Sequence, residues 1–111
     1  MAKTTPESKV KRDVTTMLRN RGAYYFYPVA GALGARAGVP DIIVCYRGWF
    51  IAIECKAGRG KPTDYQLGQI EAIQKSGGIA FVVNELNIAA VQGIMDDIDK
   101  YEEELCTHTQ V

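Results

Sequence analysis

Two apolar segments of the sequence are separated by only two residues. They run from Asp41 to Tyr46 and from Trp49 to Lys56, and Arg47-Gly48 lies between them. This spacing predicts two antiparallel strands joined by a tight turn, although arginine accepts the positive φ of a type I′ turn less readily than asparagine. Because both runs are apolar almost throughout, we expect strands that helices cover on both faces.

The remaining segments alternate between helical and strand-like patterns. Apolar spacing predicts helices over residues 7–21, from a cap at Thr63 to about Ser76, and from about Ile88 to Leu105. Short strands are predicted over residues 23–29 and 79–83. Thr4 and Glu7 have the spacing of a capping box at the first helix. We therefore expect helix, three strands, helix, strand, helix, in a single α/β domain of residues 1–111 with an ordered core of about 5–105.

Length, hydropathy and cysteine content exclude several classes of protein. No apolar run approaches the roughly 20 residues of a membrane-spanning helix, and the first residues lack the apolar core of a signal peptide. We therefore expect a cytoplasmic protein, in a bacterium or in the cytosol of a host cell. The three cysteines form no C-x-x-C pair, so free thiols are expected and a zinc site is not.

The net charge is zero, but the charges are unevenly distributed along the chain. Residues 1–61 hold eleven Lys and Arg against four Asp and Glu, and residues 62–111 hold two against nine, so the two parts carry +7 and −7. A basic part of this kind is typical of a protein that binds a polyanion. Solvated charge on helix faces explains the count equally well.

Three charged residues interrupt the apolar hairpin. A two-residue turn sets a register in which Asp41 lies opposite Glu54, with Lys56 on the same face and Cys55 on the other. Opposed residues have β-carbons about 4.5–5.5 Å apart, and two carboxylates at that separation repel each other unless a positive charge lies between them. Magnesium binds to one or two carboxylates and keeps waters for substrate phosphates. A neighbouring lysine can orient water or offset charge on a phosphoryl group. The three residues therefore predict a metal-dependent phosphodiester hydrolase.

A structural explanation of the same residues stays open. Asp41 can simply begin a strand after Pro40, and Glu54 and Lys56 can form a solvated pair at a strand end. Taken singly, each residue favours that explanation. Taken together on one face, the three favour chemistry.

The same residues resemble a known nuclease signature. Gly38–Asp41 (Gly-Val-Pro-Asp), a hydrophobic hairpin, and then Glu54-Cys55-Lys56 resemble the motif of the PD-(D/E)XK nucleases. The predicted order of elements is also similar to the restriction-endonuclease-like αβββαβ core of that superfamily, here with an extra C-terminal helix. This resemblance implies a mixed central sheet flanked by helices.

A narrower resemblance is to the VRR-NUC family, the virus-type replication-repair nucleases. It is based on Glu7-x-x-Val10 in the first predicted helix and on Gln66 in the second, and it extends from Glu7 through Gly77-Gly78. One departure is Gln69, because the family tends to have an aromatic residue three positions after that glutamine. The family suggests a viral or mobile-element setting in DNA repair and recombination.

The resemblance implies specific roles for the charged residues. Asp41 and Glu54 bind Mg²⁺ or Mn²⁺ together with the backbone carbonyl of Cys55, and Lys56 is catalytic. Glu7 matches a glutamate that supports the metal site, and Gln66 matches the family's glutamine. The helix dipole favours a glutamate at a helix N-terminus and explains Glu7 equally well. Taken alone, Gln66 would pass as an ordinary surface residue of a helix.

The expected substrate is DNA, held mainly through its phosphates. A small domain with no separate DNA-binding module is expected to act as a homodimer, and the family implies branched DNA, in the manner of Holliday-junction resolvases. The Tyr24–Tyr27 run is one possible interface, although we expect most of it in the core. Phosphate-contact candidates are Arg36, Arg59, Lys61, Lys9, Lys11 and Arg12.

Two other functions remain open at this point. The chain can be a DNA-binding module that retains the nuclease fold without cleaving, or a purely structural α/β interaction protein. Intact Asp41, Glu54 and Lys56 favour the nuclease over the non-cleaving module. The structural protein leaves the three charges unexplained.

Overall fold

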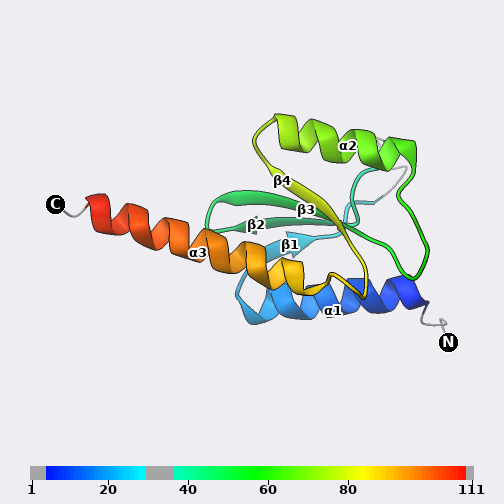
Figure 1. The fold of residues 1–111 in the computed structure, drawn as a ribbon, viewed down its shortest axis with the longest axis horizontal. Helices are drawn as coiled ribbons and strands as arrows, with labels where there is room; N and C mark the ends of the chain where they lie inside the picture. The colour runs from blue at the N-terminus through cyan, green and yellow to red at the C-terminus, as the bar shows by residue number, and fades with distance from the viewer. Residues whose placement is uncertain (1–4, 30–36, 110–111) are drawn as a thin grey trace.

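A computed structural model of the chain describes residues 5–29 and 37–109. Its elements follow one another in the predicted order (Figure 1). They are α1 (Pro6–Asn20), β1 (Tyr24–Phe26), β2 (Ile42–Tyr46), β3 (Trp49–Cys55), α2 (Asp64–Lys75), β4 (Ile79–Val83) and α3 (Ala89–Thr109). None of the helices in the described part of the chain combines the length and apolar character needed to cross a bilayer.

The strands form one mixed sheet in the order β1-β2-β3-β4. The pairs β1·β2 and β2·β3 are antiparallel, whereas β3·β4 is parallel. Tyr46 pairs with Trp49, so the predicted hairpin register is confirmed. Arg47 and Gly48 have φ values of 50° and 87°, as a type I′ turn requires of both central residues.

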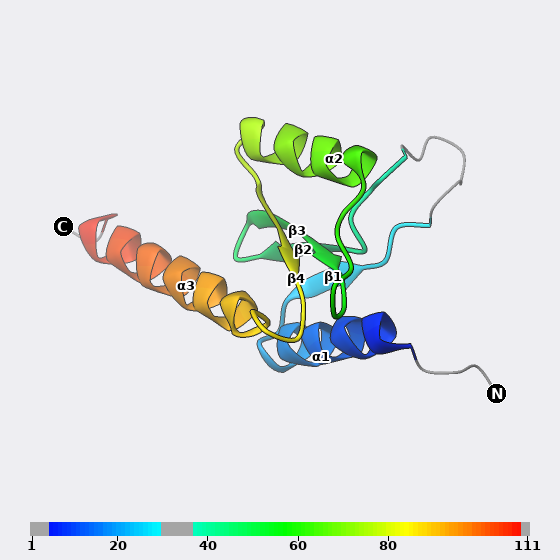
Figure 2. The same cartoon turned by 45° about the vertical axis from the view of Figure 1, so that its right-hand side comes forward.

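Helices cover the two faces of this sheet, as Figures 1 and 2 show. Ile70 of α2 packs against Ala52 of β3 and Ala80 of β4 on one face. The larger core lies on the other face, where α1 and α3 bury residues such as Leu18 and Met95 against the strands. The predicted α/β fold, a mixed sheet flanked by helices with an additional C-terminal helix, is therefore confirmed.

The ends of two helices differ from the prediction. Thr5 caps α1, and its side chain accepts a hydrogen bond from the backbone N–H of Ser8 at 3.0 Å. Thr4 lies outside the described residues. The last helix continues to Thr109 instead of ending at Leu105. Residues 101–105 are mostly strong helix formers with no glycine or proline, so nothing in the sequence stops the helix there.

The aromatic segment around β1 is more exposed than predicted. Tyr25 packs against the main core, but Tyr24, Phe26 and Tyr27 keep 71%, 47% and 44% of their surface exposed. The expectation that most of this segment is buried is therefore wrong. For Tyr24 and Phe26, the physical reason is that β1 is an edge strand, whereas α2 packs on β3 and β4 at the opposite edge of the sheet.

Candidate metal centre

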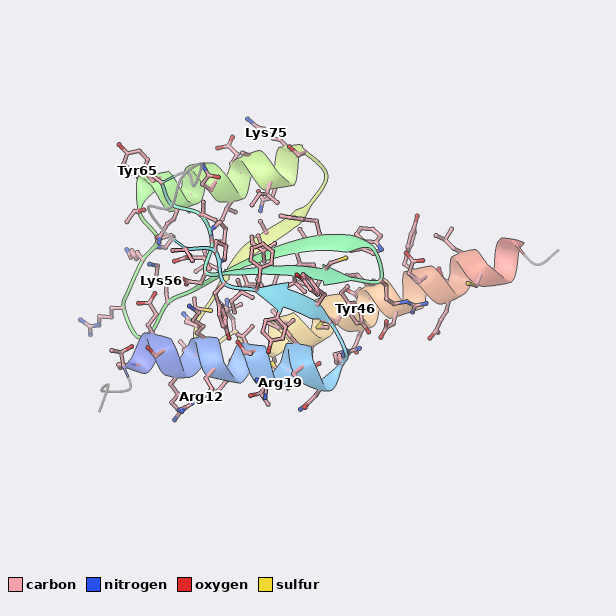
Figure 3. All side chains as sticks on the ribbon, turned by 180° about the vertical axis from the view of Figure 1, so that it is seen from behind. Arg12, Arg19, Tyr46, Lys56, Tyr65 and Lys75 are labelled. Carbon is pink, nitrogen blue, oxygen red and sulfur yellow. The ribbon has the colours of Figure 1, made fainter. Side chains whose placement is uncertain are left out.

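Three carboxylates from separate parts of the chain meet at one end of the sheet. Glu7 lies in the first turn of α1, Asp41 immediately precedes β2, and Glu54 lies near the end of β3. One oxygen from each lies within 4.8 Å of the other two. The ammonium of Lys56 lies 3.1 Å from Glu54 Oε2 and 3.7 Å from Glu7 Oε1. Figure 3 shows Lys56 between α1 and α2.

The hairpin register places Asp41 beside Glu54. The backbone N–H of Asp41 donates to Glu54 Oε1 at 3.2 Å, and the backbone N–H of Cys55 donates to Asp41 Oδ2 at 2.9 Å. These two hydrogen bonds extend the contacts between the strands by one step beyond the Ile42–Ile53 pair. The thiol of Cys55 lies in the main core, on the opposite face, as predicted.

Gln66 connects the same carboxylate to the start of α2. Its Nε2 donates to Glu54 Oε2 at 2.8 Å, and its Oε1 accepts from the backbone N–H of Thr63 at 2.8 Å. The Thr63 hydroxyl in turn accepts from the backbone N–H of Gln66, which completes a capping box. The cap at Thr63 was predicted from the sequence. The return hydrogen bond from the Thr63 backbone to Gln66 was not, although Thr-x-x-Gln is a recognisable signal for a capping box.

Burial makes the charge on Glu54 unfavourable. Its side chain is 1% exposed. Burial, and then the charge of Asp41, raise the pKa of Glu54 to about 7, although the hydrogen bond and charge of Lys56 act in the opposite direction. Burial lowers the pKa of Lys56, but its hydrogen bond to Glu54 and the three nearby carboxylates outweigh that effect and the pKa is raised. Lys56 is therefore an ammonium ion at neutral pH.

The donor set fits a hard divalent cation. Carboxylate oxygens are the ligands that Mg²⁺ and Mn²⁺ prefer, and a cation between these carboxylates would offset both the burial of Glu54 and its repulsion by Asp41, which together raise the pKa of Glu54. Asp41, Glu54 and Glu7 are the residues that can hold such an ion. The carbonyl of Cys55 stays a predicted ligand.

A groove of about 420 Å³ lies beside the carboxylates. Glu7, Lys56 and Lys61 contribute to its walls, together with the loop that follows β3. Lys61, a predicted DNA contact, therefore lies next to the site. Arg59 is exposed in the same loop, and Lys9 and Arg12 are exposed on α1. Lys11 is half-buried, and Arg36 lies outside the described residues.

Gly38 positions the site but was not assigned a role from the sequence. Its φ is +77°, and a β-carbon there would lie 2.5 Å from the carbonyl carbon of Tyr65 and 2.7 Å from the backbone nitrogen of Gln66. The segment that leads into Asp41 therefore touches the first turn of α2. The signal for this role was the glycine within Gly-Val-Pro-Asp, whose conformational freedom permits both the φ and the close approach.

We predict that Gly38→Ala lowers the free energy of unfolding by more than Gly58→Ala does. Both glycines have positive φ, but a β-carbon at Gly58 meets nothing within 4 Å, whereas one at Gly38 meets backbone atoms. Gly58→Ala should therefore cost only the backbone strain of about 1–2 kcal/mol, and Gly38→Ala should cost at least about 1 kcal/mol more. Urea unfolding measures both. Equal losses would contradict the close packing at Gly38.

A second prediction concerns the pH dependence of the metal-free protein. The pKa of Glu54 is about 7 in the folded state against an ordinary value of 4.5, so the folded state holds the proton more tightly. Its contribution to stability is present below about pH 4.5 and is lost as the pH rises through 7. Relative to wild type, Glu54→Gln should therefore gain stability, by roughly 1–3 kcal/mol, between pH 5 and pH 8.

Urea unfolding in chelator across that pH range measures the difference between Glu54→Gln and wild type. A constant difference would contradict the raised pKa. Adding Mg²⁺ or Mn²⁺ at pH 8 provides the control, because the metal should stabilise the wild type and stabilise Glu54→Gln much less.

The fold is shared with solved structures, although the sequence matches no family model and no curated protein significantly. A structure described as a VRR_NUC domain is 24% identical, with a TM-score of 0.66 over 83% of this chain and 96% of that one. A structure described as a VRR_NUC domain protein is 23% identical, with a TM-score of 0.61 over 89% of each chain. Hjc, a Holliday junction resolvase from Archaeoglobus fulgidus, is 23% identical, with a TM-score of 0.50 over 69% of this chain and 65% of that one. The chain therefore has a VRR-NUC-like fold.

Proposed function

We propose that this protein is a metal-dependent endonuclease that hydrolyses phosphodiester bonds in DNA. The observation that carries the proposal is the meeting of Glu7, Asp41 and Glu54 within 4.8 Å, with the ammonium of Lys56 at 3.1 Å from Glu54. The basic groove beside them gives a phosphodiester a place to bind. The shared fold supports the proposal, because structures with that fold are described as VRR_NUC domains and as a resolvase.

Each residue has a physical role in this mechanism. Asp41, Glu54 and Glu7 would hold Mg²⁺ or Mn²⁺, and the bound metal supplies an activated water and stabilises charge on the phosphate. Lys56 keeps its proton, so its ammonium can hydrogen-bond to the attacking water or to a phosphate oxygen as negative charge develops there. Gln66 fixes the carboxylate of Glu54. Lys61 in the groove and the exposed Arg59 beside it would bind flanking phosphates.

The preferred substrate in this proposal is branched DNA cut by a homodimer. The similarity to Hjc supports a junction substrate, because that protein is a Holliday junction resolvase. The interface we propose is a row of side chains on the α2 side of the sheet. Tyr24 pairs with Cys45, and Cys45 pairs with Phe50, so these residues share one face, and Phe26 lies two residues from Tyr24 on the same face. All four are exposed.

The nuclease is tested by cleavage of a labelled four-way junction, flap, duplex and single strand with Mg²⁺, Mn²⁺ or chelator. We predict that Lys56→Ala lowers the rate at least about 100-fold, because it removes the cation next to the reacting phosphate. Lys75→Ala is the matched control, since Lys75 is exposed and lies at the other end of α2 (Figure 3). It should cleave like wild type.

The outcomes of this experiment separate the possible functions. Paired cuts confined to the junction, and lost in chelator, support a resolvase. Cutting of every substrate retains the nuclease and rejects junction selectivity. Junction binding without cleavage by either metal would mean a non-catalytic DNA-binding module. Absence of both binding and cleavage would leave a structural role.

The homodimer is tested by light scattering. We predict a dimeric wild type and a monomeric Phe26→Asp variant, because the new carboxylate would be buried without a partner in the proposed interface. Leu86→Asp is the control at an 87% exposed position outside it, and should stay dimeric. A wild type that is monomeric at concentrations where it cleaves DNA would contradict the homodimer.

A further inference from the structure

The hydroxyl of Tyr27 is hydrogen-bonded to Thr15 of α1. The hydroxyl of Thr15 donates to the backbone carbonyl of Lys11 at 2.8 Å, and it lies 2.6 Å from the hydroxyl of Tyr27. Because the single proton of Thr15 is already used, the Tyr27 hydroxyl must be the donor in the second contact. Thr15 is buried, so the ring of Tyr27 has a fixed position above the helix.

The fixed ring carries the ammonium of Lys11. The Nζ atom lies 4.3 Å from the centroid of the Tyr27 ring, which is a cation–π distance. Lys11 is half-buried, whereas Lys9 and Arg12 on the same helix are exposed. Among the described residues, no carboxylate lies within ion-pair distance of Lys11, so its charge is not neutralised. Lys56, by contrast, is paired with Glu54 and Glu7.

Lys11 lies one turn along α1 from Glu7, a carboxylate of the candidate metal centre. It is four residues from Glu7 in α1, so the two side chains share one side of the helix. If the β1·β2 register continues for one more residue, Tyr27 lies opposite Ile42, the neighbour of Asp41. A positioned cation with no ion-pair partner among the described residues therefore lies one helical turn from a carboxylate of the cluster.

We propose that Lys11 binds a DNA phosphate next to the phosphate that is cleaved. Tyr27 is the positioning residue that holds the Lys11 side chain in place for this contact. The inference rests on the proposed nuclease function and adds a specific contact to it. A free lysine side chain loses much rotamer freedom when it binds a phosphate. The Tyr27 ring removes part of that freedom beforehand and leaves other ammonium protons available, so the phosphate is bound at a smaller entropic cost.

A purely structural role makes different predictions. If the Lys11–Tyr27 contact only fastens α1 to the end of β1, removing it lowers stability and leaves DNA affinity and its salt dependence unchanged. A phosphate contact has the opposite signature, because each neutralised phosphate contributes about one unit to the slope of log Kd against log salt concentration.

The test compares Lys11→Met with Lys9→Met, a lysine on the same helix that lacks the ring contact. Affinity for labelled four-way junction and duplex is measured in chelator at several salt concentrations, which separates binding from cleavage. Lys11→Met should weaken binding about 3–10-fold and reduce the salt slope by about one, and Lys9→Met should do less of both. Equal effects of the two variants would overturn the assignment of Lys11.

The role of Tyr27 is tested with Tyr27→Leu, Tyr27→Phe and a double variant. Tyr27→Leu removes the ring and should weaken binding by less than Lys11→Met without changing the salt slope, because the lysine charge remains. Tyr27→Phe keeps the ring under the ammonium and should restore most of the affinity. Lys11→Met combined with Tyr27→Leu should bind no worse than Lys11→Met alone, because Tyr27 acts through Lys11.

These outcomes are distinct from failure of the nuclease proposal. Thermal unfolding identifies any variant that has lost its fold, and loss of stability with unchanged affinity and slope would overturn the phosphate contact. Wild-type protein that binds DNA with the expected Lys11 dependence but cleaves nothing would reject the nuclease and retain the contact. If wild-type protein binds no DNA, both proposals are wrong.

Discussion

The buried carboxylate of Glu54 is the constraint on which the rest of the site depends. A charged group that is 1% exposed is stable only if its oxygens are hydrogen-bonded and its charge is balanced. Three donors contact its oxygens, and each comes from a different part of the chain: the backbone of Asp41, the side chain of Gln66 and the ammonium of Lys56. The contacts of Glu54 therefore connect three segments: the residue before β2, the start of α2 and the residue after β3.

The balance at this point is incomplete without a cation. Lys56 supplies one positive charge, but Glu54, Asp41 and Glu7 bring three carboxylates together. Burial, and then the charge of Asp41, raise the pKa of Glu54, and the capping box and the close contact at Gly38 hold α2 in place beside this unfavourable group. A scaffold that keeps mutually repelling carboxylates together is physically reasonable when a divalent ion completes it.

Local rules account for most of what the sequence predicted correctly. The spacing of Arg47-Gly48 determines the hairpin register, and strand alternation then places Asp41, Glu54 and Lys56 together and Cys55 on the opposite side. These relations need no knowledge of the tertiary structure. The choice between neighbouring threonines at the start of α1 was not determined by local pattern, since both have suitable spacing for a cap.

What the sequence did not predict depends on how the layers are assembled. The exposure of Tyr24 and Phe26 follows from the position of α2 over β3 and β4, at the opposite edge of the sheet from β1. Apolar patterning does not reveal this position. Apolar patterning also does not reveal the position of Tyr27. An aromatic residue next to a proline is compatible with a core position, and only the packing of α1 beside β1 shows that its ring carries the ammonium of Lys11.

The uneven charge of the chain also has a more specific meaning in three dimensions. Arg21 and Arg47 count as basic residues of the first part, but both bind Asp99 of α3, and Arg21 also binds Asp96. Their charge is therefore balanced within the molecule and would not be available to the proposed DNA substrate. The acidic end of α3 points away from the start of α1, where the carboxylate cluster lies (Figure 1). In the proposed function, the acidic end of α3 would repel DNA, and cations near the site that form no ion pair among the described residues, such as Lys61 and Lys11, would attract it. The charges available for binding would then be fewer than the composition indicates.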